Sequence, residues 1–142
     1  MTTFKAPVRD IDFVLNEVLD YQAHYKTIAA GAEATPDMVE AITAEAAKFA
    51  EEVLSPLNKV GDEEGCTWND SEVTTPTGFK EAYQMWIDGG WQGLSHPTKY
   101  GGQGLPMSLG LIKSELIGTA NWSWGMYPGL SLGAMNTLIV HG

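Results

Sequence analysis

Apolar residues recur every three or four positions in five stretches of the chain, and this period predicts amphipathic helices. The stretches cover residues 7–25, 36–54, 77–88, 106–119 and 128–141. Four of them begin at a proline, which is well tolerated in the first turn of a helix. We find no convincing alternation of apolar and polar residues, apart from a brief extended piece around Glu72–Thr74. The predicted fold class is therefore all-α, with about five helices in an up-and-down bundle.

The segments between these helices are rich in glycine, proline and turn-forming side chains. Residues 61–76 are predicted to form a surface loop, and residues 121–129 an aromatic and glycine-rich turn. Residues 89–106 form the longest connection, in which Trp91, Leu94 and Tyr100 are interleaved with glycines. Disordered segments are poor in large apolar residues, so we expect this loop to be ordered and close-packed.

Composition and charge restrict the partners of the chain. Its net charge is −10 over 142 residues, and no cluster of lysine and arginine exists to attract nucleic acid or an anionic membrane. No window is apolar enough to cross a bilayer. Cys66 is the single cysteine, which excludes an intramolecular disulfide and favours a reducing, cytoplasmic location. All five tryptophans lie after residue 65, in the half that carries little charge.

No catalytic, cofactor-binding or metal-binding constellation is evident in the residues themselves. Gly101–Gly104 is glycine-rich but lacks the spacing and the lysine of a phosphate-binding loop, so a structural turn is the favoured interpretation. The histidines at 24, 96 and 141 are far apart and show no metal-ligand spacing. The acidic pairs and runs are typical of a solvated helix face. We therefore predict no catalytic residue, no cofactor ligand and no metal ligand within these residues.

The glycine-rich loop carries a resemblance to a known family. Gly90-Trp91, Gly93-Leu94, Pro97 and the run Tyr100 to Pro106 resemble the N-terminal helical domain of the acyl-CoA dehydrogenases. Ser114-Glu115-Leu116 is similar to a family helix motif, although serine replaces the first acidic residue. The resemblance covers about residues 36–142, and the N-terminal extension resembles the long bacterial branch that includes the 3-methylmercaptopropionyl-CoA dehydrogenases.

The resemblance implies an FAD enzyme that oxidises an acyl-CoA to the 2,3-enoyl-CoA. In the family, the catalytic glutamate and most flavin contacts lie in later domains, so this chain alone is expected to be inactive and to hold no FAD. Its expected role is to help wall the acyl and flavin cleft. The residues expected there are Trp124, Met126, Tyr127 and Leu130, with packing in the core or between domains as the alternative.

The same resemblance implies an organisation and a set of partners. Residues 1–34 are expected to form a helical extension and residues 35–142 the N-terminal domain, with the middle β-domain and the C-terminal domain absent. The chain stops directly after an apolar helix, so we expect the natural chain to continue past Gly142. The implied partners are an acyl-CoA substrate, the remaining domains of the enzyme and further copies in a homo-oligomer. Two alternatives are a free-standing helical interaction module without flavin and a small carrier of apolar ligands.

Overall fold

The computed structural model describes residues 4–142, and most of them are helical. The first part of the chain contains α1 (Val8–Phe13), a π-helical segment (Val14–Val18) and α2 (Tyr21–Tyr25). It continues into one long helical rod, which consists of α3 (Pro36–Lys48), a second π-helical segment (Phe49–Leu54) and α4 (Ser55–Glu64). A small hairpin of β1 (Thr67–Asn69) and β2 (Glu72–Thr74) leads to α5 (Phe79–Asp88), α6 (Met107–Ala120) and α7 (Trp122–His141). The predicted all-α class is confirmed.

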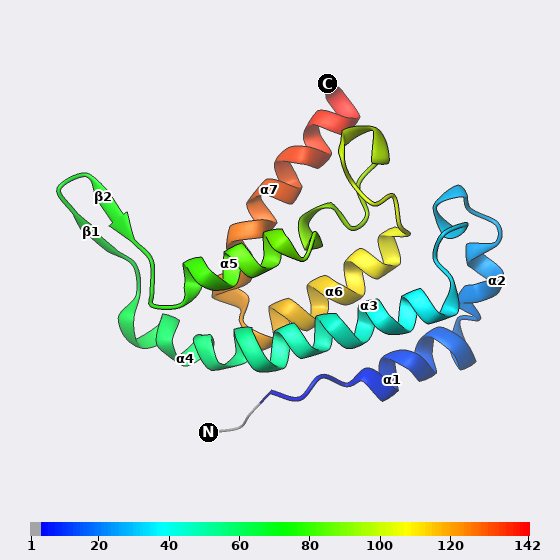
Figure 1. The fold of residues 1–142 in the computed structure, drawn as a ribbon, viewed down its shortest axis with the longest axis horizontal. Helices are drawn as coiled ribbons and strands as arrows, with labels where there is room; N and C mark the ends of the chain where they lie inside the picture. The colour runs from blue at the N-terminus through cyan, green and yellow to red at the C-terminus, as the bar shows by residue number, and fades with distance from the viewer. Residues whose placement is uncertain (1–3) are drawn as a thin grey trace.

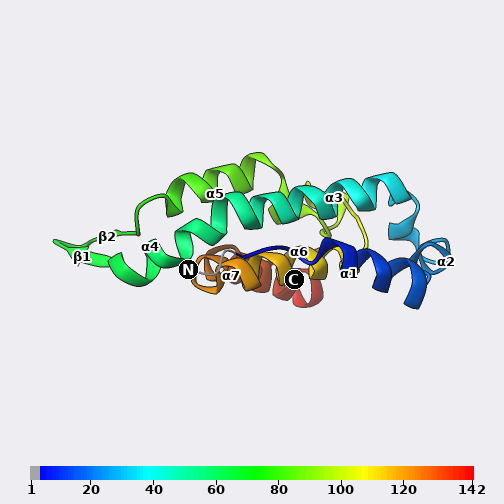
Figure 2. The ribbon, with the colours of Figure 1, turned by 90° about the horizontal axis from the view of Figure 1, so that it is seen from below.

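The helices lie in two layers. Figure 1 shows α3 and α4 as one long rod with α6 beside it, and Figure 2 shows α3, α4 and α5 on one side and α1, α6 and α7 on the other. Helix α6 contacts both α3 and α7, and α4 also contacts α7. The hairpin extends from the far end of α4, away from the other helices (Figure 1). No helix among residues 4–142 has the length and apolar run that crossing a membrane needs.

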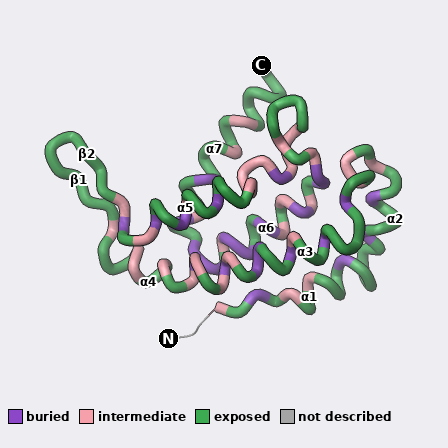
Figure 3. Tube along the Cα trace, viewed as in Figure 1, coloured by how far each residue is buried: buried purple, intermediate pink, exposed green. Residues whose placement is uncertain are grey.

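Two apolar cores fill the space between the layers. The larger one joins α3, α5, α6 and the start of α7, and Trp86 and Trp124 are its largest fully buried side chains. The smaller one joins α1, α2, α3 and the beginning of α6 around Tyr25, Leu105 and Leu109. Figure 3 shows buried residues where these helices meet, whereas the hairpin and the second half of α7 are exposed. The stripe predicted for α6 is therefore confirmed.

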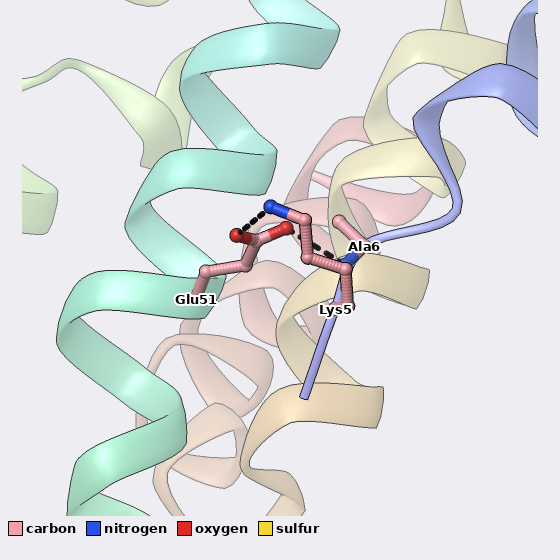
Figure 4. Close-up of polar contacts among 3 residues, drawn as sticks. All are labelled: Lys5, Ala6 and Glu51. Carbon is pink, nitrogen blue, oxygen red and sulfur yellow. Dashed lines mark hydrogen bonds and ion pairs between the residues drawn. The ribbon is translucent and has the colours of Figure 1, made fainter. Parts of the chain in front are cut away.

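The N-terminal segment is fastened to the long rod by one carboxylate. Glu51 accepts hydrogen bonds from Lys5 Nζ at 2.6 Å and from the backbone N–H of Ala6 at 2.9 Å (Figure 4). The hydrogen bond from Lys5, followed by that from Ala6, lowers the pKa of the Glu51 carboxyl group. This contact holds the chain before α1 against the middle of the rod. The proposed division between residues 34 and 35 stays a prediction.

The predicted loop at residues 61–76 was wrong in its first part. The rod continues past Pro56 to Glu64, because Pro56 lies in the first turn of α4 and the preceding π-helical segment accommodates its missing N–H. The brief extended piece predicted at Glu72–Thr74 is confirmed as β2. The helix predicted over residues 7–25 is likewise interrupted, at Asp20, whose positive φ of 45° ends the first segment and caps α2.

The turn predicted at residues 121–129 was also wrong, because these residues form the first half of α7. Asn121 caps this helix: its side-chain oxygen accepts a hydrogen bond from the N–H of Trp124 at 3.0 Å. Pro128 lies inside the helix. Glycine, proline and aromatic residues favour turns locally, but here the cap and the burial of Trp124 outweigh that preference.

The central loop is ordered, as predicted. It folds back on itself through backbone hydrogen bonds from Gln103 to Gly93, from Gly104 to His96 and from Leu105 to Leu94, at 2.9 to 3.1 Å. The close approach requires a glycine at 102, since a Cβ there would lie 2.2 Å from the carbonyl oxygen of His96.

Candidate functional site

All four residues predicted to wall a pocket lie in the first half of α7. The start of this helix is fixed by Asn121, which is almost fully buried. Besides capping the helix, its amide nitrogen donates to the carbonyl oxygen of Leu54 at 3.1 Å. One side chain thus determines where α7 begins and joins it to the long rod. The four predicted residues follow Asn121 along the first half of α7.

Trp124 belongs to the core. Its side chain is fully buried, and its indole N–H donates to the carbonyl oxygen of Phe79 at 3.2 Å. Its ring lies edge-on to those of Phe49 and Trp86, with centroids 5.8 and 5.7 Å apart. With no exposed surface, Trp124 can support a pocket wall only from behind. Its role in such a wall stays a prediction.

Met126, Tyr127 and Leu130, in contrast, are exposed, and Leu130 is 70% exposed. Met126 and Leu130 are four residues apart and therefore lie on the same face of the helix. From Trp122 to Val140 the helix has no charged side chain, and its exposed apolar residues continue to Leu138 and Val140. We call these five residues the α7 surface: Met126, Tyr127, Leu130, Leu138 and Val140. A helix that is apolar on every face is usually covered on every face.

Tyr127 borders a pocket of about 360 Å³ on one side of α7. The pocket is lined by aromatic and small side chains together with one lysine: Val73, Thr75, Phe79, Lys80, Tyr83 and Tyr127. The rings of Phe79 and Tyr127 meet edge-on, and the hydroxyl oxygen of Tyr127 lies 3.4 Å from the Sγ atom of Cys66. The hydrogen bond with Cys66, together with desolvation, raises the pKa of Tyr127 to about 12. The phenol is therefore neutral and suited to packing or hydrogen bonding.

A second hollow of about 430 Å³ separates the far half of α7 from the central loop. Its sides are apolar: Met135, Leu138 and Ile139 come from α7, and Tyr100 and the glycines around it come from the loop. His96 lies beside it, and both ring nitrogens of His96 are buried without a hydrogen-bond partner among the described residues. This hollow suits an apolar group.

A polar network that sequence reasoning missed fixes the loop beside α7. Lys113 is only 3% exposed; its ammonium group donates to the carbonyl oxygen of Trp91 at 3.0 Å and stands 4.9 Å from the centroid of the Trp86 ring. Desolvation lowers the pKa of Lys113 to about 8. Gln92 accepts from the indole of Trp86 at 2.8 Å and donates to the carbonyl oxygen of Pro128 at 3.2 Å.

One signal in the sequence pointed to Lys113. It lies four residues after Leu109, and so on the buried stripe of its helix, where an unpaired charge is uncommon.

Within residues 4–142 no group of three potential ligands gathers to hold a metal ion. From Trp122 to Val140, α7 offers neither a basic side chain nor a cation. The arrangement around α7 is an apolar helix surface with one hollow beside its first half and another beside its second half.

Comparison with known proteins relates this chain to a known protein family. A family model described as the acyl-CoA dehydrogenase N-terminal domain matches residues 36–142. The 3-methylmercaptopropionyl-CoA dehydrogenase of Ruegeria pomeroyi is 37% identical over 140 residues, which cover 99% of this chain and 24% of that protein. The chain thus spans about a quarter of the length of this curated relative.

Proposed function

The chain belongs to the acyl-CoA dehydrogenase family, in which it corresponds to the N-terminal helical domain, and on that premise we propose that it serves an enzyme that oxidises an acyl-CoA to the 2,3-enoyl-CoA. Within that enzyme, the chain supplies part of the wall around the acyl group and the flavin. By itself it is inactive, because the family's catalytic glutamate lies in a later domain. The alternative is an interaction module that works without flavin.

The observation that carries this proposal is the α7 surface. Met126, Leu130 and Leu138 are large apolar side chains on a helix without charges, and they face solvent in the chain alone. Covering each of them fully would contribute roughly 1.5–3 kcal/mol. A surface of this kind marks a contact with another domain or with a ligand. The remaining domains of the enzyme and the acyl group are the partners that the family supplies.

The α7 surface is suited to covering the flavin ring rather than to binding the whole FAD molecule. Met126, Tyr127 and Leu130 can lie against a flat ring or an acyl chain, and Trp124 supports them from behind. The α7 surface carries no cation that would pair with the pyrophosphate of FAD. FAD bound to the enzyme would supply the acceptor for a hydride from the β-carbon of the substrate. This chain's part is to exclude water and to position the acyl group.

The substrate is an acyl-CoA, and the name of the relative suggests one to test first, 3-methylmercaptopropionyl-CoA. The decisive comparison is between this chain and a polypeptide that continues into the middle and C-terminal domains. The longer protein should carry the yellow flavin and lose its colour on adding acyl-CoA under anaerobic conditions. This chain should be colourless and unable to oxidise any acyl-CoA. A longer protein without flavin would leave the interaction module as the better interpretation.

The wall itself is tested in the longer protein by Leu130→Ala. Removing this side chain should raise KM or change the preferred acyl length, because the group it contacts would lose apolar surface. Leu19→Ala is the matched control, since Leu19 is similarly exposed but lies before α2. Equal kinetic effects of the two substitutions would contradict a wall role. Thermal shift of this chain with acyl-CoA tests the carrier alternative, which requires a shift without flavin.

A further inference from the structure

A third and smaller pocket lies where the central loop, α6 and α7 meet. His96 of the loop and Lys113 of α6 line it, together with Leu132 and Asn136 of α7, and we call it the Lys113 pocket. Its volume is about 90 Å³, and one water molecule needs roughly 10–15 Å³, so a group of a few heavy atoms fits. None of its lining residues belongs to the α7 surface, and none of them is acidic. It shares only His96 with the hollow beside the central loop.

Lys113 brings a positive charge to this pocket without a carboxylate to balance it. Its ammonium group has three N–H donors, of which one bonds to the carbonyl oxygen of Trp91. No acidic side chain pairs with it among residues 4–142. Desolvation lowers its pKa to about 8, so most of the charge remains at pH 7. Buried charges in proteins are normally paired, and the group that suits this position is therefore an anion.

His96 adds two nitrogen atoms whose hydrogen-bonding capacity is unused. Both Nδ1 and Nε2 are buried and have no partner among the described residues. A neutral imidazole ring always carries one N–H donor. The other polar side chains are already engaged: Gln92 bonds on both sides, and the hydroxyl groups of Ser95 and Ser114 donate to backbone carbonyl oxygens. The donors that remain for a ligand come from His96 and Lys113.

The apolar part of the lining distinguishes between kinds of anion. Met107, Leu111 and Leu132 line the pocket alongside the two nitrogen-bearing side chains. Phosphate has four oxygen atoms, and those facing these apolar side chains would be left without donors, which is costly. A short carboxylate has both oxygen atoms at one end and hydrocarbon at the other. This division matches the pocket, which has N–H donors on one part of its lining and apolar side chains on another.

We propose that the Lys113 pocket binds a short-chain monocarboxylate of the size of acetate or propionate. Lys113 is the counter-ion and His96 a hydrogen-bond donor to the carboxylate, while the hydrocarbon end packs against Met107, Leu111 and Leu132. Met107 and Leu111 are more than half exposed, so a small ion can enter from solvent. The site contains neither Met126 nor Leu130, and it is therefore independent of the role proposed for the α7 surface.

A titration of the ¹⁵N-labelled chain with sodium propionate at pH 7, followed by NMR, tests the proposal. The amide signals of His96, Lys113 and Asn136 should shift together and saturate in the millimolar range. Sodium chloride at the same ionic strength should not reproduce these shifts. Propionamide has the same shape without the charge, so it should bind at least tenfold more weakly. Sodium phosphate should give no saturating shift at these residues.

Lys113→Met and His96→Phe test the two donors separately. Lys113→Met removes the counter-ion and should weaken propionate binding at least tenfold, whereas Lys99→Met removes an exposed lysine and should leave it unchanged. His96→Phe keeps a ring but removes both nitrogen atoms, and it should weaken binding several-fold. Circular dichroism checks that the three variants stay folded.

Four results would overturn the proposal. The first is a propionate titration that does not saturate or that matches sodium chloride. The second is equal binding of propionamide and propionate, which would remove the role of the charge. The third is saturation by phosphate instead of propionate, which would make the pocket a site for another class of anion. The last is propionate binding that survives both Lys113→Met and His96→Phe.

Discussion

Replacing Lys113 by methionine measures what a buried, unpaired charge costs this fold. Among the described residues no carboxylate pairs with Lys113, and its ammonium group has one hydrogen bond, to the carbonyl oxygen of Trp91. Desolvation lowers its pKa from 10.5 to about 8. The folded chain therefore binds this proton less tightly than the unfolded chain does. Stability should rise with pH wherever the unfolded state holds the extra proton.

The magnitude follows from the two pKa values. A fall from 10.5 to about 8 corresponds to a cost of about 3 kcal/mol at roughly 1.4 kcal/mol per pKa unit. The cost is nearly complete at pH 7 and disappears as the pH rises from about 8 to about 10.5. Methionine fills similar space without a charge, but it leaves the carbonyl group of Trp91 unpaired, at about 1–3 kcal/mol. At pH 7 these two effects of Lys113→Met largely cancel.

The pH dependence of stability separates the cost of the buried charge from the cost of the unpaired carbonyl group. Between pH 7 and pH 10 the wild type should gain about 2–3 kcal/mol of unfolding free energy relative to Lys113→Met. Urea denaturation followed by tryptophan fluorescence measures both proteins at each pH, and their difference cancels groups that titrate alike in both. Lys99→Met, which removes a lysine from the exposed loop, records the effect of losing a surface charge. A difference between wild type and Lys113→Met that stays constant across this range would refute the reasoning.

Four further substitutions test the supports of the candidate site. Asn121→Ala removes the cap of α7 and leaves a buried carbonyl group unpaired, so urea denaturation should show a loss of about 2–4 kcal/mol. Gly102→Ala should destabilise the chain by at least about 2 kcal/mol because its Cβ would overlap backbone, whereas Gly133→Ala, whose Cβ meets nothing, should stabilise α7 by about 0.5–1 kcal/mol. Cys66→Ala removes the hydrogen bond to Tyr127 and should lower the pKa of that phenol from about 12 towards 10, which NMR titration of its ring carbons would detect.

The sequence predicted α6 well, because its large apolar residues recur at helical spacing. Leu109 and Leu116 of α6, and Leu105 just before it, are buried as expected. The first half of α7 was missed because its residues favour turns locally, while the contacts that make it helical are distant in sequence. Asn121 bonds to Leu54, and no window around either residue contains both. Tertiary contacts of this kind outweigh local propensity, and a single sequence does not display them.

The four residues expected to form a wall came from the family resemblance, and that role stays a prediction. Their exposure could not be predicted, because a helix that is apolar on all sides has no period that shows which side is covered. The structure alone separates Trp124, which is buried, from Leu130, which faces solvent. Lys113 shows the opposite case, because its position on the stripe of α6 indicated burial. Only the structure shows that a carbonyl group and an aromatic ring, rather than a carboxylate, accompany it.

The burial along α7 gives this helix two halves of different stability. Its first half is held by Asn121, by Trp124 and by the hydrogen bond from Gln92 to Pro128, whereas no residue after Pro128 is fully buried. Segments with few buried contacts open most readily, so the second half depends on whatever covers Leu138. A later domain that covers it would therefore stabilise the helix and close the hollow beside the central loop. Under the proposed function, assembly with a later domain would complete the proposed wall.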